Sequence, residues 1–273
     1  MTAAMAVGLL STAVNAGSNT VYLNQTGNGQ TATIDQTLGS ASSVGTNGQS
    51  FLQDNGSGLG NNSLTVNQSG YGNTLSRYQQ GIQSGTGDSA NIHQSGSNGD
   101  VELQQYGEGN HAVAVQGGGY GNYLSIYQSG SASEADVTQT GTYNSLYSYQ
   151  SGSQNTLSFN QHGYGNYGYG NQYGTGATAD MNQTGTYNKA VGYQGGNNAY
   201  LLSNQNGYGN YIYSSQSGLS QWANVTQTGT YNSSVGQQTG PGQNVTTVTQ
   251  SGYGNSANYN QNGVGNHTTI NQH

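Results

Sequence analysis

Hydrophobic and polar positions alternate along most of this chain, in short runs that begin near an asparagine and end at a glutamine. The run at 144–150 reads NSLYSYQ. Side chains of a strand point alternately to two faces, so Leu146, Ser148 and Gln150 share a face with Asn144. The same parity holds in NYLSIYQ at 122–128 and NTLSFNQ at 155–161. Each run therefore predicts one β-strand whose interior face carries Asn, two apolar or small residues, and Gln.

These runs recur with a fixed period. There are 22 units of the form Asn-x5-Gln-x-Gly, some with substitutions, and sixteen of the 21 intervals between their glutamines are 11 residues long. Glycine stands two places after the glutamine in 19 units, where its access to positive φ suits a tight corner between strands. A disordered polar chain is the alternative for such a composition, but it predicts no register of this kind.

Alternate units differ in their first interior position, so the true repeat is a pair of strands of about 22 residues. Six of the seven departures from Asn begin even-numbered units, at Gln30, Asp88, Ser133, Ala177, Ala199 and Gln221. The predicted fold is all-β: a β-solenoid with two strands per coil and about 11 coils or 22 strands, in which strand n pairs in parallel with strand n+2. Irregular loops are expected near 37–46, 54–61 and 80–87, although Asn47, Gln49, Phe51 and Gln53 fit one strand.

Interior Asn and Gln side chains are expected to form ladders along the stack, each amide bonded to the amides above and below it. A buried amide without a partner costs about 1–3 kcal/mol, and a ladder removes that cost for all but the end coils. The predicted ladder residues are Asn19, Gln25, Gln36, Asn62, Gln68, Asn73, Gln79, Gln94, Asn110, Gln116, Asn122, Gln128, Gln139, Asn144, Gln150, Asn155, Gln161, Asn166, Gln172, Gln183, Asn188, Gln194, Gln205, Asn210, Gln216, Gln227, Asn232, Gln238, Asn244, Gln250, Asn255, Gln261, Asn266 and Gln272. The predicted corner glycines are Gly27, Gly70, Gly96, Gly107, Gly130, Gly141, Gly152, Gly163, Gly174, Gly185, Gly196, Gly207, Gly218, Gly229, Gly240, Gly252 and Gly263.

The composition argues against several classes of function. Charged residues make up 4% of the 273 residues, with two basic and nine acidic side chains and a net charge of −7. Two separate cations form no basic patch, so nucleic acid is not an expected partner, and no apolar run is long enough to insert into a membrane. There is no cysteine, the five histidines stand singly and no carboxylate pair recurs. We therefore expect no enzyme activity, no metal site and no cofactor.

The N-terminus differs from the rest of the chain. Residues 1–16 read MTAAMAVGLLSTAVNA, an apolar stretch ending in small residues, with Val14 and Ala16 at the −3 and −1 positions of a cleavage site. This pattern is typical of a secretory signal peptide, although no Lys or Arg precedes the apolar stretch. A disordered apolar N-terminus is the alternative. The first interpretation predicts a secreted protein with a single repeat domain at 17–273.

Some charged and aromatic positions admit two interpretations. Arg77 falls on the interior face by parity, so it marks either a local bulge that releases the guanidinium or a gatekeeper that slows assembly. Solubility or gatekeeping likewise accounts for the outward acids Asp35, Asp100, Glu102, Glu134, Asp136 and Asp180.

Tyrosine is concentrated at outward positions, at Tyr22, Tyr78, Tyr123, Tyr127, Tyr147, Tyr149, Tyr167, Tyr169, Tyr211 and Tyr213. These rings reflect either β-propensity on an exposed face or lateral bundling and adhesion through aromatic rows.

The ends of the predicted stack suggest self-assembly. Repeat proteins usually cap such ends with atypical units or blunt them with charge, whereas the first unit from Asn19 and the last unit at 266–272 keep the regular motif. Low charge, a single proline and stacked amides are typical of cross-β assembly, so both ends are predicted to dock onto another copy. The alternative is a monomeric secreted solenoid, either an adhesin or an ice- or surface-binding protein, which would need capped ends and one flat face of identical residues.

The repeat resembles that of curlins, the subunits of bacterial curli fibres, over nearly all of residues 19–272. The likeness rests on interior pairs such as Asn62 and Gln68, Asn110 and Gln116, Asn210 and Gln216, and Asn255 and Gln261. It implies an extracellular amyloid fibre (pilus or fimbria) at the cell surface that serves biofilm matrix and adhesion, with copies of this chain as the main partner. It also implies a nucleator subunit and an outer-membrane export machinery as partners. Major and nucleator subunits share the repeat, and the near-regular units here favour a major, polymerising subunit.

Overall fold

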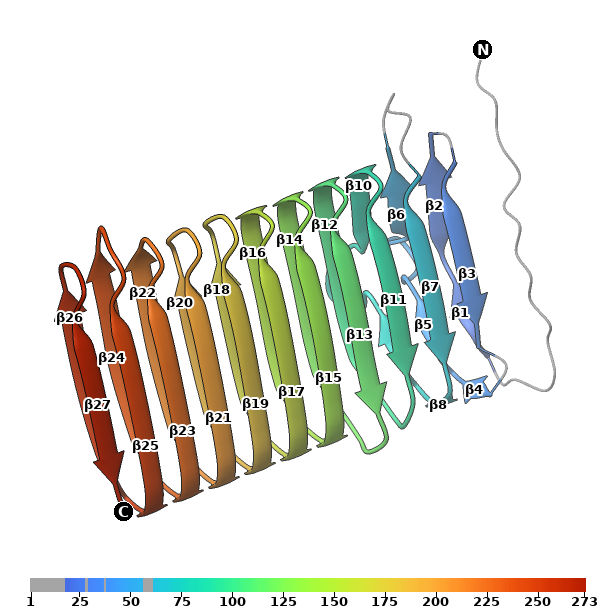
Figure 1. Ribbon diagram of the computed structural model, residues 1–273. Helices are drawn as coiled ribbons and strands as arrows, with labels where there is room; N and C mark the ends of the chain where they lie inside the picture. The colour runs from blue at the N-terminus through green and yellow to red at the C-terminus, as the bar shows by residue number, and fades with distance from the viewer. Residues whose placement is uncertain (1–17, 28, 37, 56–60) are drawn as a thin grey trace.

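The chain is a flat stack of β-coils. The computed structural model describes residues 18–27, 29–36, 38–55 and 61–273, and among these residues it contains strands and turns but no helix. Two long parallel sheets form two layers that run the length of the stack (Figure 1). The predicted all-β solenoid of about 11 coils with two strands per coil is confirmed.

The two sheets take alternate strands of the chain. The first sheet contains β1 (Thr20–Val21), β2 (Leu23–Thr26), β5 (Ser43–Val44), β6 (Phe51–Asp54), β9 (Thr74–Leu75), β10 (Ile82–Thr86), β12 (Asp100–Glu108), β14 (Tyr123–Ser131), β16 (Ser145–Ser153), β18 (Tyr167–Gln172), β20 (Lys189–Gln194), β22 (Tyr211–Gly218), β24 (Ser233–Gly240) and β26 (Ser256–Asn262). The second sheet contains β3 (Thr31–Asp35), β7 (Ser63–Gln68), β11 (Ser89–Gln94), β13 (His111–Gly117), β15 (Glu134–Thr142), β17 (Thr156–Tyr164), β19 (Thr178–Thr186), β21 (Tyr200–Tyr208), β23 (Trp222–Thr230), β25 (Val245–Tyr253) and β27 (His267–Gln272). Two short strands, β4 (Gly39–Ser40) and β8 (Gly70–Tyr71), pair with each other at one corner.

Successive coils are in register. In β14 and β16, Gln128 lies opposite Gln150, and every other residue of the pair keeps the same offset of 22 positions. Each strand thus pairs in parallel with the strand one coil away, and equivalent positions of the repeat stack on one another. This register places the interior Asn, apolar and Gln positions of neighbouring coils directly over one another.

The core is a thin apolar layer between the two sheets. Leu124, Leu146, Leu157 and Phe159 are fully buried within it. The widest side chains are accommodated by glycines in the opposite sheet, because a Cβ on Gly168 would overlap the Phe159 ring. The sequence YGYG at 167–170 is therefore a packing device, with tyrosines facing outward and glycines leaving room for the core.

The first three coils depart from the regular pattern, and the predicted loop at 37–46 is interrupted by two short strands. Residues 39–40 form β4, while β5 pairs with both β1 and β9 and so belongs to the second coil. The chain leaves the sheet at 45–50 instead, where Thr46 and Gln49 form an antiparallel bridge. Asn47 and Gln49 are consequently exposed and do not continue the interior strand that begins at Phe51.

The predicted loop at 80–87 is also misplaced. Residues 82–86 form β10, and the excursion from the sheet lies earlier, at 76–81. Gln79, predicted as an interior ladder residue, is exposed. Gln83 takes that place, bonded to Gln53 on one side and to Gln105 on the other.

Two further sequence predictions fall wholly or partly outside the described residues. The predicted signal peptide at 1–16 lies wholly outside them. So do residues 56–60 of the predicted loop at 54–61, whose first residue, Asp54, ends strand β6.

Candidate functional site

Two continuous glutamine ladders run through the interior, one beside each sheet. In every step the side-chain amide nitrogen (Nε2) donates to the amide oxygen (Oε1) of the glutamine in the next coil, with N···O distances of 2.6–3.1 Å. The first sheet's ladder contains Gln25, Gln53, Gln83, Gln105, Gln128, Gln150, Gln172, Gln194, Gln216, Gln238 and Gln261. The second contains Gln36, Gln68, Gln94, Gln116, Gln139, Gln161, Gln183, Gln205, Gln227, Gln250 and Gln272.

The ladder glutamines from Gln53 to Gln272 also bond the backbone. Gln150 Nε2 donates at 2.8 Å to the carbonyl of Glu134 and at 3.2 Å to the carbonyl of Asn155, in addition to Gln172 Oε1 at 2.8 Å. The interior amide therefore links its own coil, the opposite sheet and the next coil. Because buried polar groups need such partners, the ladder makes a polar interior compatible with burial.

The asparagine positions close the corners. Asn144 Oδ1 accepts the backbone N–H of Asn166 in the next coil at 3.0 Å. Its Nδ2 donates to the carbonyl of Thr140 at 3.0 Å and to that of Gly163 at 3.1 Å. Each such asparagine thus links its own corner, through hydrogen bonds, to the corner of the neighbouring coil and to the start of that coil's strand.

Most of the predicted ladder residues are brought together in the interior. The fully buried ones are Asn62, Gln68, Asn73, Gln94, Asn110, Gln116, Asn122, Gln128, Gln139, Asn144, Gln150, Asn155, Gln161, Asn166, Gln172, Gln183, Asn188, Gln194, Gln205, Asn210, Gln216, Gln227, Asn232, Gln238, Asn244, Gln250 and Gln261. In the end coils Asn19, Gln25, Gln36, Asn255, Asn266 and Gln272 are half-buried. Gln79 alone lies outside, and its replacement Gln83 carries the same Gln-x-Gly signal.

The corner glycines let neighbouring backbones approach closely. Among the predicted ones, all but Gly174 and Gly196 have positive φ, for example +129° at Gly130. A Cβ on Gly130 would overlap the carbonyl oxygen of Gly152 in the next coil. Gly85 and Gly119 occupy equivalent corners that the regular spacing did not single out.

A charged cluster fastens the excursion at 76–81 to the fourth coil. Glu102 Oε1 accepts the backbone N–H of Tyr78 at 2.7 Å, and Oε2 accepts that of Gln79 at 3.2 Å. Arg77 Nε lies 3.4 Å from Asp100 Oδ2. Asp100 and Glu102 are therefore only 4% and 2% exposed, and the prediction that they are solubilising surface acids is wrong. Arg77, which falls on the interior face by parity, lies in this bulge with its guanidinium partly exposed.

Burial changes the acidity of these carboxyl groups. It raises the pKa of Asp100 to about 7, helped by the nearby charge of Glu102 and opposed by Arg77. Burial likewise raises the pKa of Glu102, against the hydrogen bonds from Tyr78 and Gln79. A third buried acid, Asp88, occupies an asparagine position, and burial raises its pKa although Asn110 donates to it twice.

The outer face of the first sheet is rich in tyrosine. Tyr127 and Tyr149 stack with ring centroids 4.6 Å apart, and Lys189 Nζ lies 5.4 Å from the Tyr167 ring and 5.6 Å from the Tyr211 ring. The ten tyrosines predicted to point outward are half-exposed or exposed, namely Tyr22, Tyr78, Tyr123, Tyr127, Tyr147, Tyr149, Tyr167, Tyr169, Tyr211 and Tyr213. The Lys189 ammonium group thus lies between two aromatic rings.

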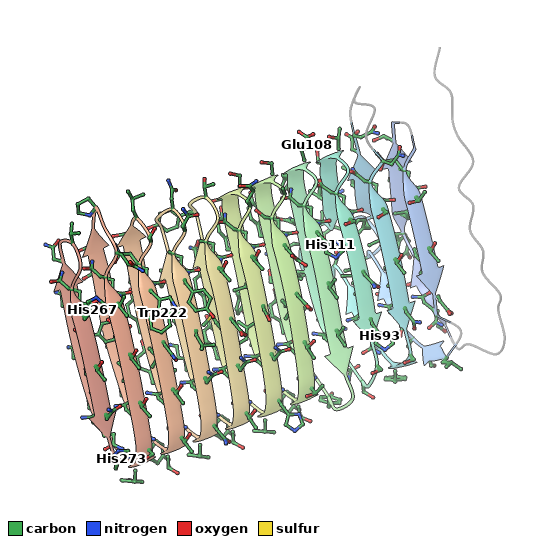
Figure 2. The ribbon with its side chains drawn as sticks, in the orientation of Figure 1. His93, Glu108, His111, Trp222, His267 and His273 are labelled. Carbon is green, nitrogen blue, oxygen red and sulfur yellow. The ribbon has the colours of Figure 1, made fainter. Side chains whose placement is uncertain are left out.

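The described residues contain no group of three or more His, Cys, Asp or Glu side chains arranged to hold a metal ion. Figure 2 shows the labelled histidines set apart along the stack, with His267 and His273 at the two ends of the last strand. Within the same residues no helix is long and apolar enough to cross a membrane.

The ladders have a direction, and that direction gives the two ends of the stack different chemistry. Because each glutamine donates towards the C-terminal coil, the ladders begin with the amide oxygens of Gln25 and Gln36 and end with the amide nitrogens of Gln261 and Gln272. No protein-family model matches this chain, and no curated protein matches its sequence.

Proposed function

We propose that this protein is a structural subunit of an extracellular curli-like amyloid fibre, and that copies add head to tail by stacking the last coil of one on the first coil of the next. The observation that carries the proposal is the complementarity of the two ladder ends. Gln261 and Gln272 present amide donors, and Gln25 and Gln36 present the matching acceptors. One more coil placed at either end continues both ladders without changing their direction.

The backbone supports the same arrangement. Among the described strands, β26 and β27 come last in their sheets and each pairs on one side only, as do β1 and β3 at the other end. Unpaired strand edges of this kind template the addition of further strands. All strands of the stack are parallel, so a copy added in the same orientation continues both sheets.

The end coils are also suited to burial. Ile270 of the last coil and Ile34 of the first are partly buried and packed against core clusters. Residues 255–272 contain no Asp, Glu, Lys or Arg, and residues 19–36 contain only Asp35. Few charges would have to be desolvated when two ends meet, and the apolar surface buried there favours association.

The extracellular setting and the role in biofilm matrix and adhesion are proposed from the resemblance to curlins. So are a nucleator subunit and an outer-membrane export machinery as partners. The repeat itself supports the structural part of the proposal, because a stack with a polar laddered interior and low charge fits cross-β assembly.

The test is polymerisation of purified 17–273 in dilute buffer, followed by thioflavin-T fluorescence and electron microscopy. We expect a lag, growth into unbranched fibres, and a shorter lag when preformed fibres are added as seeds. A β-rich chain that stays monomeric for days at micromolar concentration would overturn the proposal. That result would favour a monomeric secreted solenoid that binds a surface.

A further inference from the structure

A single column of seven tyrosines follows the corner at which the chain passes from the second sheet to the first. Its members, from the fifth coil to the eleventh, are Tyr120, Tyr143, Tyr164, Tyr187, Tyr208, Tyr231 and Tyr253. We call this set the tyrosine column. It is distinct from the tyrosine rows on the face of the first sheet, and the end-to-end stacking proposed above makes no use of it.

Two alternating corner sequences build the column. Corners such as 163–166 read GYGN and place tyrosine second, whereas corners such as 185–188 read GTYN and place it third. In the second type Tyr187 itself takes the left-handed conformation, with φ of +55°. The phenol positions of neighbouring coils are thereby offset by one residue, which sets successive rings at different angles.

Glycine makes this packing possible. A Cβ on Gly165 would lie 2.7 Å from the Tyr187 ring, and a Cβ on Gly209 would lie 2.8 Å from the Tyr231 ring. The ring of each GTYN corner therefore rests on the glycine of the GYGN corner before it. Because the two corners alternate, the GTYN corners at 141–144, 185–188 and 229–232 recur every 44 residues.

The resulting contacts are close and uniform. Ring centroids of neighbours lie 5.3 Å apart at Tyr208 and Tyr231 and 5.9 Å apart at Tyr231 and Tyr253, with interplanar angles of 88° and 89°. The other four contacts of the column fall within the same distances and are also edge-to-face. Every ring is open to solvent, with exposures from 41% at Tyr164 to 77% at Tyr253.

We propose that the tyrosine column is an oxidative modification site, at which hydrogen peroxide and a haem peroxidase couple the rings of neighbouring coils into dityrosine. Each of two phenols loses its hydroxyl hydrogen as a proton and an electron. The two radicals form one carbon–carbon bond between ring positions ortho to the hydroxyls, and the hydrogens at those carbons move to the oxygens. One peroxide is reduced to two waters for each link formed.

Proximity and exposure favour this coupling. The ortho carbons of two rings must meet, and the column holds neighbouring rings with centroids 5.3–5.9 Å apart, all of them open to solvent at the corners. Tyr127 and Tyr149 are closer to each other, but they are fixed on paired strands and Tyr127 is half-buried. The Tyr187 hydroxyl also interacts with that of Tyr164, and this interaction raises the pKa of Tyr187.

The links would lie within one molecule. Neighbouring members of the column are 21 to 23 positions apart, as in Tyr143 to Tyr164 and Tyr164 to Tyr187. Each link would close one coil covalently at its corner. Closing such loops restricts the unfolded chain, so a cross-linked molecule should resist unfolding more than the parent.

The test uses folded, monomeric protein, treated with hydrogen peroxide and a haem peroxidase before any fibre forms. Dityrosine fluorescence and mass spectrometry of digested peptides should show links between neighbours of the column on chains of monomer mass. A variant combining Tyr143→Phe, Tyr187→Phe and Tyr231→Phe removes every neighbouring pair of the column. It should lose these links to the level of denatured protein.

The matched control combines Tyr123→Phe, Tyr167→Phe and Tyr211→Phe on the face of the first sheet, and it should keep the column links unchanged. The inference is overturned if links are spread over all tyrosines, if they join different molecules, or if the control loses the column links as strongly. Because the readout is made on monomers, failure of fibre growth would not affect it.

Discussion

Gln128 donates from its side-chain amide nitrogen to the amide oxygen of Gln150 at 2.9 Å, across one coil of the stack. Gln150 in turn donates to the amide oxygen of Gln172 at 2.8 Å. The polar interior therefore depends on every glutamine of the ladder, because a missing amide leaves the glutamines on both sides each without one hydrogen-bond partner.

Gln150→Leu keeps the side-chain size but removes the hydrogen bonds. The carbonyls of Glu134 and Asn155 and the oxygen of Gln172 would lose a donor, at about 1–3 kcal/mol for a buried group left unsatisfied. We expect a clear fall in the urea midpoint, followed by circular dichroism. Gln237→Leu is the control, since that side chain is exposed and a surface change costs within about 0.5 kcal/mol. Equal midpoints for the two variants would contradict the role of the ladder.

Gly130→Ala should prevent the corner from closing, because φ is +129° and the new methyl group would overlap the carbonyl of Gly152. Gly109→Ala has a milder conformation, with φ of +66° and no atom within 4 Å of the added Cβ. There the cost is only that of a left-handed residue, about 1–2 kcal/mol. Thermal melts should show loss or gross destabilisation of the fold for the first and a modest shift for the second. Similar melts would mean that corner approach is not limiting.

Stability should fall as the pH rises from about 4 to about 7. Asp100 keeps its proton up to about pH 7 in the folded chain, whereas an unfolded aspartate loses it near pH 3.9. Between these values the folded chain binds more protons, so the free energy of unfolding decreases with pH. Asp100→Asn should flatten this slope in denaturation midpoints measured across the range. Asp136→Asn, at an exposed position, should leave the slope as it is.

Head-to-tail growth predicts a specific result for end variants. Ile270→Lys places a charge on the open side of the last coil, and Ile34→Lys does so on the first. Neither variant alone should form fibres. An equimolar mixture should form a dimer, because each supplies the end that the other lacks.

The control for these variants is Thr269→Lys, on the exposed side of the same last strand, and it should elongate normally. Sedimentation velocity distinguishes the outcomes. Dimers formed by Ile270→Lys alone would indicate pairing of like ends and would contradict the proposed direction of stacking.

The sequence period predicts the two-sheet stack because each unit carries its own strand and corner, and the parallel register follows from repeating them. The exchange of Gln79 for Gln83 could not be read in the same way. QQG at 79–81 and QSG at 83–85 both fit the unit, and spacing from Gln68 favours the first. Glu102 of the next coil holds Gln79 outside the interior, because its carboxylate accepts the backbone N–H groups of Tyr78 and Gln79 in the excursion at 76–81. Such a contact is tertiary and leaves no local signal.

The tyrosine column, in contrast, is encoded locally. The alternation of GYGN with GTYN is visible along the chain, but its effect on ring angle requires the left-handed conformation at residues such as Tyr143. A non-glycine residue in that conformation is uncommon, so the perpendicular contacts were not evident from spacing alone.

The opposed directions of the two kinds of interior amide bear on how far such a stack can extend. Glutamine carbonyls point towards the N-terminal coil, as in Gln150, and asparagine carbonyls point towards the C-terminal coil, as in Asn144. Their dipoles partly cancel along the axis, whereas the peptide dipoles of an α-helix add up to partial charges at its ends. Adding coils therefore builds up little electrical potential at either tip, and the length of the stack meets no electrostatic limit from its own interior.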